Sequence, residues 1–355
     1  MASQLVSTHG VMEGGGSYNL YARIPAGGAN LSLPFLQEAV RRITLEAEEQ
    51  PVVVADYGSS QGKNSLAPMR VAIKGLRERV GGQRPIFVFH IDQAANDFNT
   101  LFEVLHSDSE RYTVEDTDVF PSAIGRSFYE SVLPKGYVHL GWSCYAAVWL
   151  SRIPMTIPGH FLYLGSSGEV RAEFDRQAAD DWRSFLSLRA QELRSGGRLV
   201  VVLPGLSDEG GTGFEPLFAH ANEVLADMVS QGTITAEERA RMVLGAYPRR
   251  RSQLLEPFHG YSQYRGLTVE CCELSPLRDS AWEDYEQDGD QEKLIKRHVG
   301  SFRAIFVPSL AAALESGGKS QVFADEFARR LTRRLANQPA PYHSFTQTMV
   351  LAKGK

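Results

Sequence analysis

The sequence predicts an α/β fold with a mostly parallel, doubly wound sheet and a helical cap. Three observations lead to this prediction. Apolar runs typical of buried strands, such as the run at 52–55, recur through the first two hundred residues. Segments with helical spacing of apolar residues separate them, and this alternation is typical of parallel sheets. After Pro204 the segments become mainly helical, as expected of a cap over the C-terminal edge of the sheet.

The elements follow in order from these local patterns. The first thirty residues are rich in Gly and Ser and are expected to form a loop. Apolar periodicity predicts helices over 34–49, 66–80, 96–105, 145–151, 176–193, 215–231, 235–244, 290–315 and 321–336. Strands are expected at 52–55, 86–89, 118–120, 137–142, 198–203, 268–274 and 343–352. Gly196-Gly197 is expected to end the helix over 176–193 as a C-cap.

Composition restricts the possible functions. The chain has 355 residues and a net charge of −5 at pH 7, which argues against a nucleic-acid partner. Three cysteines cannot form a disulfide framework, and no apolar run approaches the ~20 residues that span a bilayer. The first ten residues lack the pattern of a signal peptide, so we expect a cytoplasmic protein. The nine histidines show no metal-binding spacing, so no metal is expected.

Acidic residues end the first two predicted strands. Asp56 follows the first strand, and Gly58 and Gly62 lie on the turn after it, where small residues let the backbone approach a ligand. Asp92 ends the second strand and is placed to accept hydrogen bonds from two ribose hydroxyls. In doubly wound sheets ligands bind beyond such strand ends. The pair of acids therefore indicates a nucleoside-type cofactor.

The same turn also fits a different chemistry. Residues 58–62 match G-x-S-x-G, the nucleophile elbow of α/β-hydrolases, with Ser60 as nucleophile and His343 late enough in the chain to serve as base. The elbow normally follows several strands, and only about fifty residues precede it here, with no convincing strand among them. A serine hydrolase remains the alternative at this point.

Five ordered segments resemble one known family. They are 55–64, 92–99 with its Asn-Asp-Phe-Asn core, 127–129, 143–154 and 190–198. Together they are similar to the SABATH methyltransferases, which include plant salicylate, benzoate and jasmonate carboxyl methyltransferases and bacterial relatives. The resemblance implies a class I methyltransferase (Rossmann-like) fold, S-adenosylmethionine as cofactor, and a fatty acid or small aromatic acid as acceptor. It also implies a homodimer.

The resemblance implies a set of site residues. The expected cofactor-binding residues are Ser17, Asp56, Gly58, Ser59, Asn64, Asp92, Gln93, Ser127, Phe128, Ser143 and Tyr145. The expected substrate-binding residues are Tyr18, Arg23, Tyr145, Trp149, Phe218, Phe302 and Ile305, with Tyr247 as a further candidate for the pocket lining. Tyr145 and Trp149 are the expected catalytic residues, because Trp149 can donate its indole N–H to one oxygen of the acceptor carboxylate.

The N-terminal segment departs from the family pattern. Glu13 stands before the Gly pair where the family carries Lys, and the position of the family's Gln falls near 23–25. We expect Arg23 to replace this Gln, since a guanidinium binds a carboxylate through two hydrogen bonds. The departure also keeps open a cofactor-binding protein that has lost catalysis.

The expected organisation of the chain places one core beneath a cap. Its parts are a site-covering N-terminal segment (1–30), a cofactor-binding core (31–210), a helical cap (211–340) that contains a core strand near 268–274, and a terminal core strand (341–355). The expected reaction is an in-line displacement by a carboxylate. Because a carboxylic acid is already ionised at neutral pH, it needs no general base.

Overall fold

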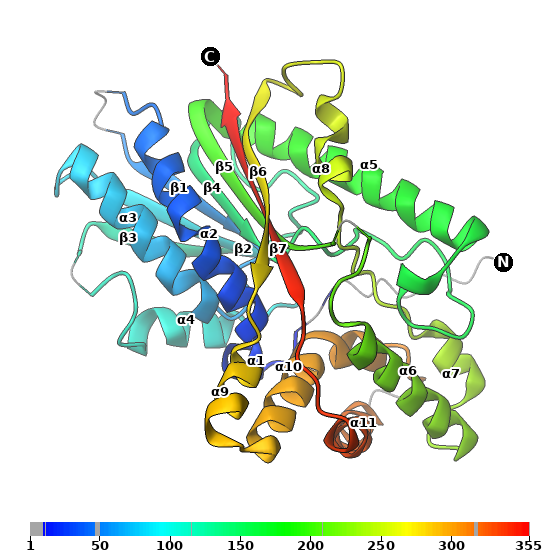
Figure 1. The fold of residues 1–355 in the computed structure, drawn as a ribbon. Helices are drawn as coiled ribbons and strands as arrows, with labels where there is room; N and C mark the ends of the chain where they lie inside the picture. Colours follow the sequence, from blue (N-terminus) through cyan, green and yellow to red (C-terminus); the bar gives the residue numbers. More distant parts are fainter. Residues whose placement is uncertain are drawn as a thin grey trace.

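A computed structural model describes residues 10, 12–46, 50–114, 116–207, 209–315 and 319–354. It contains a seven-stranded sheet in the order β3-β2-β1-β4-β5-β7-β6 (Figure 1). The strands are β1 (Val52–Tyr57), β2 (Ile86–Asp92), β3 (Val119–Gly125), β4 (Val138–Cys144), β5 (Leu193–Gly205), β6 (Leu267–Leu277) and β7 (Ser344–Lys353). Only β7 runs antiparallel to its neighbours β5 and β6. The predicted mostly parallel α/β sheet is confirmed.

Strand β1 lies at the centre of the sheet because both of its faces are apolar. All six of its residues are buried. Val52 and Val54 pack into one hydrophobic cluster, and Val53 and Ala55 pack into a second cluster on the opposite face. This division follows from the alternation of side chains along a strand. The carboxyl end of β1 therefore lies between those of β2 and β4.

Helices cover both faces of the sheet. The cluster around Val52 and Val54 receives α2 (Arg23–Arg42), α3 (Leu66–Val80) and α4 (Phe98–Ser107). The opposite cluster receives α5 (Gly168–Glu192), whose Phe174, Phe185 and Leu186 are fully buried. Figure 1 shows α2 and α3 on one side of the strands and α5 on the other. Three short 3₁₀ turns lie at Lys63–Ser65, Tyr163–Gly165 and Glu256–Phe258.

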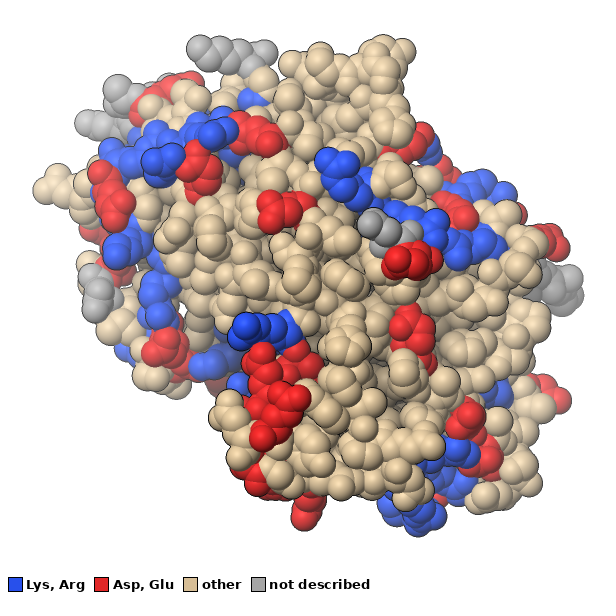
Figure 2. Space-filling view, viewed as in Figure 1, with Lys and Arg blue, Asp and Glu red and all other residues tan. Residues whose placement is uncertain are grey.

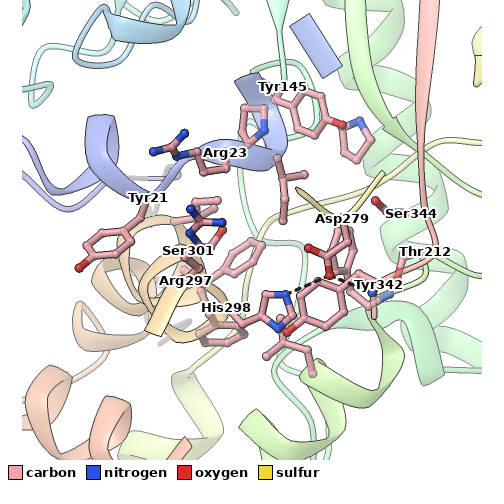
Figure 3. Close-up of a pocket in the computed structure, with 18 of the residues that line it drawn as sticks. Tyr21, Arg23, Tyr145, Thr212, Asp279, Arg297, His298, Ser301, Tyr342 and Ser344 are labelled. Carbon is pink, nitrogen blue, oxygen red and sulfur yellow. Dashed lines mark hydrogen bonds and ion pairs between the residues drawn. The ribbon is translucent and has the colours of Figure 1, made fainter. Parts of the chain in front are cut away.

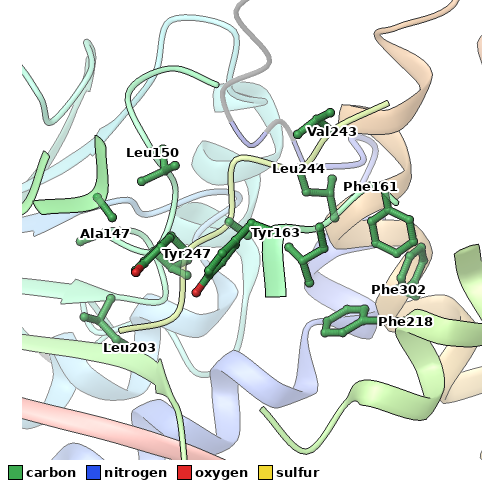
Figure 4. Packing of buried hydrophobic residues seen from close by; sticks show 14 of the residues in the cluster. Ala147, Leu150, Phe161, Tyr163, Leu203, Phe218, Val243, Leu244, Tyr247 and Phe302 are labelled. Atoms are coloured by element: carbon green, nitrogen blue, oxygen red, sulfur yellow. The ribbon is translucent and has the colours of Figure 1, made fainter. Parts of the chain in front are cut away.

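The cap gathers helices that are far apart in sequence. These are α1 (Ser17–Tyr21), α6 (Glu215–Ser230), α7 (Ala236–Arg241), α9 (Ser280–Asp288), α10 (Gln291–Ala311) and α11 (Ser320–Asn337), which lie together below the strands in Figure 1, whereas α8 (Arg251–Leu255) lies beside α5. Phe161 of the core contacts Phe302 of the cap edge-to-face at 6.1 Å, and Phe218 packs on the same ring (Figure 4). One hydrophobic cluster thus runs from the sheet into the cap.

The expectation of an N-terminal loop was wrong for residues 17–21 and 23–30, which are helical, while residues 1–9 and 11 lie outside the described residues. Helix α1 begins at Ser17, and α2 begins at Arg23 instead of near residue 34. The Gly and Ser residues that suggested a loop are explained in part by packing. Gly28 lies so close to Tyr145 that a Cβ would be 2.5 Å from the ring, and the Ser32 and Thr348 hydroxyls are 2.7 Å apart. Small residues let α2 approach the sheet, and this tertiary packing outweighs its low helix propensity.

Two other expectations were also wrong. The segment 145–151 is not helical, because its backbone bonds to another segment: the Leu150 N–H donates to Gly245, and the Tyr247 N–H donates to Val148. Tyr145 takes a left-handed conformation with φ +55°. Gly196 is not a helix C-cap, since α5 ends at Glu192 and Gly196 lies within β5.

The described surface carries both signs of charge. Lys and Arg side chains are interspersed with Asp and Glu on the face shown in Figure 2. This face therefore offers no continuous basic track of the kind that binds nucleic acid. Within the described ranges, no helix combines the length and apolarity required to cross a bilayer.

Candidate active site

Two cavities meet between the sheet and the cap. The first, which we call the strand-end cavity, lies at the carboxyl ends of the central strands and is lined in part by Gly58, Ser60, Asp92, Ser127 and Phe128. The second, the cap cavity, has a volume of about 360 Å³ and is lined mainly by apolar side chains of the cap. Both cavities share the lining residues Met12, Tyr18, Tyr145 and Trp149.

Asp92 is one of two acidic residues, with Asp97, that line the strand-end cavity. Its Oδ2 accepts from the Ser60 backbone N–H at 2.7 Å, and its Oδ1 accepts from the Gln93 N–H at 2.8 Å. Desolvation raises the pKa of this carboxyl to about 6, although the two backbone hydrogen bonds act in the opposite direction. A carboxylate with four lone-pair sites and two N–H partners can still accept from hydroxyl groups of a ligand. This arrangement fits a ribose.

The loop after β1 approaches its neighbours very closely. Gly58 has φ +95°, and a Cβ on it would lie 2.0 Å from the Cβ of Ala146. Ser60 also has positive φ, at +48°. Among the described residues, the buried hydroxyls of Ser59 and Ser60 have no hydrogen-bond partner. A backbone that only glycine permits, next to unpartnered hydroxyls, fits a polar ligand held against the loop.

Asp56 belongs to a separate buried cluster. Its Oδ2 accepts from the Ser65 hydroxyl at 2.5 Å and lies 3.0 Å from His90 Nδ1, while His90 Nε2 lies 2.8 Å from the Tyr112 hydroxyl. Asp56 is not among the described residues that line the strand-end cavity. The sequence reasoning missed this cluster, although a histidine within the apolar strand β2 was a signal of it. A cofactor-binding role for Asp56 stays a prediction.

Tyr18, Tyr145 and Trp149 lie where the cavities join. The Tyr145 hydroxyl is 2.9 Å from Thr346 Oγ1 of β7. Burial raises the pKa of Tyr145 and of Tyr18 well above the ordinary value, so both phenols stay protonated at neutral pH. The Trp149 ring packs against Phe306 at 6.1 Å, and it lies so close to Gly10 that a Cβ there would be 2.2 Å from the ring. The junction thus presents neutral hydrogen-bonding groups.

The cap cavity contains the expected apolar residues and several that were not expected. Phe218, Phe302 and Ile305 line it, and so does the exposed Arg23 (Figure 3). Tyr247 is absent from its described lining and stacks on Tyr163 at 4.3 Å instead (Figure 4). Beyond residue 210, the polar lining residues are Thr212, Arg278, Asp279, Ser280, Lys293, Lys296, Arg297, His298, Ser301, Tyr342 and Ser344. They come from four distant segments, so no local motif identified them.

The remaining expected residues lie around the cavities. Gln93 lines the strand-end cavity and donates to the Gly10 carbonyl at 3.2 Å. Ser59, Asn64 and Ser143 are outside its described lining, and Ser143 donates to the Tyr57 carbonyl. Asn64 donates to the Ala22 carbonyl and hydrogen bonds with Tyr18.

Ser17 lies on a surface groove beside Glu13 and Arg303. The roles of Ser17, Ser59, Asn64, Gln93 and Ser143 in cofactor binding stay predictions.

Within the described ranges, no group of three or more His, Cys, Asp or Glu residues is arranged to hold a metal ion.

Comparison with known proteins identifies the family. A family model described as SAM dependent carboxyl methyltransferase matches residues 3–353. Gibberellic acid methyltransferase 2 of Arabidopsis thaliana is 25% identical over 282 residues, which cover 73% of this chain and 72% of the relative. Probable 7-methylxanthine methyltransferase 3 of Theobroma cacao is 32% identical over 225 residues, covering 58% of this chain and 60% of the relative.

A solved structure agrees on the fold. The structure described as loganic acid methyltransferase with SAH superposes with a TM-score of 0.80 and 23% identity, covering 97% of this chain and 99% of the other. At that identity the likeness establishes the class I methyltransferase fold. The family match over residues 3–353 also establishes the family to which the chain belongs. The protein belongs to the SABATH-type S-adenosylmethionine-dependent carboxyl methyltransferases, and S-adenosylmethionine is its methyl donor.

Proposed function

We propose that this enzyme methylates the carboxylate of a hydrophobic acid, either a fatty acid or a small aromatic acid, held in the cap cavity. The observation that carries the proposal is the meeting of the two cavities at Tyr18, Tyr145 and Trp149. S-adenosylmethionine, bound in the strand-end cavity, supplies an electrophilic methyl group. The junction is the place where an acceptor in one cavity reaches a donor in the other.

The strand-end cavity has the groups required to hold the donor. Asp92 would accept hydrogen bonds from the ribose hydroxyls, while Phe128 and Ser127 would border the adenine. Gly58 lets the chain pass close to the ligand because it carries no Cβ. Gln93 would flank the adenosine.

The junction acts by orientation and desolvation, without a general base. An acceptor carboxylic acid is ionised at neutral pH, so no proton has to be removed. Tyr18 and Tyr145 stay protonated and can donate hydrogen bonds. Trp149 would fix one carboxylate oxygen with its indole N–H, and such positioning can contribute several kcal/mol to the rate. The apolar walls exclude water, which favours a transition state in which opposite charges are neutralised.

The cap cavity selects hydrophobic acids. Its walls include Phe214, Phe218, Phe302 and Phe306, with ring centroids of neighbouring pairs 5.2–6.4 Å apart. Arg23 and Lys296 also line the cavity and are exposed to solvent. These two exposed cations in the cavity lining would attract an anionic acceptor. Arg23 would also contact the carboxylate in place of the Gln that the family carries.

The serine hydrolase alternative receives no support from the site. No histidine is among the described residues that line the cavity around Ser60. His343 is exposed at the start of β7. The Ser60 backbone N–H is engaged by Asp92.

A turnover assay tests the proposal. The enzyme is incubated with S-adenosylmethionine and a panel of fatty and aromatic acids, and methyl esters are measured by mass spectrometry. We expect ester from at least one hydrophobic acid and none from its primary amide analogue. Binding of S-adenosylhomocysteine without any ester would instead indicate a homologue that has lost catalysis. The homodimer and the cytoplasmic location stay predictions, and light scattering tests the first.

A further inference from the structure

We propose that Thr346 is a positioning residue for methyl transfer, which fixes the Tyr145 hydroxyl at the junction of the two cavities. Thr346 is not among the described residues that line either cavity. Its effect on the reaction is therefore exerted through Tyr145. The inference rests on the proposed function, because it assumes that the methyl group is transferred at this junction.

The backbone of Tyr145 provides the first observation. Tyr145 follows β4 directly, lines both cavities, and has φ +55°. A residue other than glycine in this left-handed region costs of order 1–3 kcal/mol, and such strained residues cluster at active sites. The Tyr145 N–H donates to the Val202 carbonyl of β5 at 2.8 Å, which ties the strained turn to the sheet. The sheet thus fixes the point from which the Tyr145 side chain extends.

The partner of the Tyr145 hydroxyl provides the second observation. The Thr346 Oγ1 lies 2.9 Å from this hydroxyl, and Thr346 is fully buried within β7. Either hydroxyl can be the donor, and in both cases the bond fixes the position of the phenol oxygen. Because threonine is branched at Cβ, its χ1 angle is restricted and its hydroxyl has a well-defined position. Thr346 thus holds the far end of the Tyr145 side chain.

The packing of α2 provides the third observation. A Cβ on Gly28 would lie 2.5 Å from Tyr145 Cε2 and 3.0 Å from Thr346 Oγ1. The backbone of α2 therefore packs directly against the contact between the two hydroxyls. Glycine inside a helix costs about 1 kcal/mol relative to alanine, and this close approach explains its presence here. Tyr145 is thus held by three elements: its backbone by β5, its hydroxyl by β7 and its ring by α2.

A fixed Tyr145 matters because an in-line displacement depends on alignment. The Tyr145 side chain borders both cavities, so a shift of its ring changes the space for the donor and for the acceptor. A misplacement of about 1 Å can reduce a rate about 100-fold, even when the replaced residue is remote from the chemistry. Without the Thr346 hydroxyl, the phenol oxygen loses its partner in β7. The expected defect therefore lies in kcat, and cofactor binding is expected to remain.

The test replaces one β7 hydroxyl at a time. Thr346→Val has nearly the shape of threonine but cannot bond to Tyr145, whereas Thr346→Ser keeps a hydroxyl. Thr348→Val is the matched control, because Thr348 lies two residues further on the same face of β7. Thr348 is 2% exposed, and its hydroxyl lies 2.7 Å from that of Ser32. Neither Thr348 nor Ser32 is in the described lining of either cavity, so the control removes a similar bond away from the junction.

The readout separates kcat from binding. Steady-state kinetics uses S-adenosylmethionine with benzoic, cinnamic, dodecanoic and hexadecanoic acids, and calorimetry measures binding of S-adenosylhomocysteine. For each acid that the native enzyme methylates, we expect Thr346→Val to lower kcat tenfold or more. The acceptor KM and the Kd of S-adenosylhomocysteine should change less than threefold. Thr346→Ser should keep kcat within threefold of native, and Thr348→Val should leave kcat unchanged even where its Tm falls as far as that of Thr346→Val.

A double-mutant cycle shows whether Thr346 acts through Tyr145. Tyr145→Phe should itself lower kcat, and it leaves no hydroxyl for Thr346 to hold. Adding Thr346→Val to Tyr145→Phe should therefore change kcat less than twofold, since two residues that act through one contact are not additive. A purely structural role of Thr346 would instead lower kcat by the same factor in both backgrounds.

The outcomes separate this inference from the proposed function. Suppose that the native enzyme forms methyl ester. A kcat of Thr346→Val within threefold of native, an equal loss in Thr348→Val, or additive effects in the cycle then overturns the inference and leaves the proposed function standing. If the native enzyme forms no ester from any acid, the proposed function and the inference are both overturned.

Discussion

The Arg303 guanidinium of α10 donates to the Glu13 carboxylate at 2.9 Å, and so joins the N-terminal segment to the cap. The Glu13 backbone N–H also donates to the Ala304 carbonyl at 2.9 Å. Glu13 stands where the resemblance leads us to expect Lys, and the ion pair gives this residue a structural role. It holds the segment that carries Met12 and Tyr18 next to the cavity junction.

Glu13→Gln should weaken this attachment. Both side chains of the ion pair are partly exposed. We therefore expect the variant to lower the free energy of unfolding by less than about 1 kcal/mol and to raise the acceptor KM a few fold. Added salt should raise the native KM in the same way, because it screens the pair. The measurement is KM against NaCl concentration. Glu46→Gln, which breaks an ion pair with Arg194, is the control; equal effects of both variants would contradict the expectation.

Asp92 should make cofactor binding depend on pH. Its pKa is raised to about 6, mainly by desolvation, and the ribose hydroxyls need the ionised form. Below pH 6 a proton therefore competes with the cofactor, and affinity for S-adenosylhomocysteine should be about tenfold weaker at pH 5 than at pH 8. The ligand-free protein should instead gain stability as pH falls from 7 to 5, since the folded state then binds more protons than the unfolded state. Asp92→Asn should bind S-adenosylhomocysteine weakly, with an affinity that calorimetry shows to be independent of pH. The same pH dependence in the native protein and the variant would count against a role for Asp92 in cofactor binding.

Trp149→Phe should separate acceptor binding from cofactor binding. Phenylalanine keeps an aromatic ring beside Phe306 but has no N–H to donate to the carboxylate. Loss of a hydrogen bond to a charged group costs about 1.5–3 kcal/mol, so kcat/KM for the acceptor should fall roughly 10- to 150-fold. Binding of S-adenosylhomocysteine should stay within twofold. Trp282→Phe, outside both cavities, is the matched control, and an unchanged kcat/KM in Trp149→Phe would remove Trp149 from the mechanism.

Arg23→Ala should raise the acceptor KM several fold with little change in kcat. Arg23 is an exposed cation that lines the cap cavity, where it can contact the acceptor anion. Steady-state kinetics with a carboxylic acid provides the measurement. Arg176→Ala, on the exposed face of α5, removes the same charge elsewhere. If the acceptor KM is unchanged in Arg23→Ala, the proposal that Arg23 contacts the carboxylate in place of the expected Gln is wrong.

Gly58→Ala should abolish cofactor binding. The new Cβ would lie 2.0 Å from Ala146, and φ +95° is strained for alanine. Gly81→Ala isolates the backbone effect, because Gly81 has φ +74° with nothing within 4 Å. We expect about 1–3 kcal/mol loss of unfolding free energy in the control and a larger loss in Gly58→Ala. Chemical denaturation measures the stability of both variants, and calorimetry measures their binding of S-adenosylhomocysteine. Similar losses of unfolding free energy in Gly58→Ala and Gly81→Ala would show that the contact with Ala146 is unimportant.

The strands and most helices could be predicted because their signals are local. Val52–Val54 and the apolar spacing of 66–80 need no tertiary information, and the prediction for α3 matches at both ends. The start of α2 was missed because Gly28 and Ser32 favour a helix only once they pack on Tyr145 and Thr348. The segment at 145–151 was misjudged for the same reason, since its hydrogen bonds run to 245–247.

The site could be predicted only in part. Asp92, Tyr145 and Trp149 lie within ordered sequence blocks, and the structure places all three in cavity linings. Asp279, His298 and Tyr342 are separated by tens of residues, and only the folding of the cap brings them together. Asp56 had the right position for a ligand contact, but the buried Ser65 and His90 already engage its carboxylate.

The reversed direction of β7 links acceptor selection to the chemical step. Because β7 is antiparallel to β5, its first residues reach the edge where the parallel strands end, and Phe345 pairs there with Gly205. The chain leaving α11 thus passes through Tyr342 in the cap cavity and, four residues later, delivers Thr346 to the Tyr145 hydroxyl. Tyr342 in the wall of the cap cavity is therefore only four residues from the contact between Thr346 and Tyr145. Acceptor identity should accordingly affect kcat as well as KM.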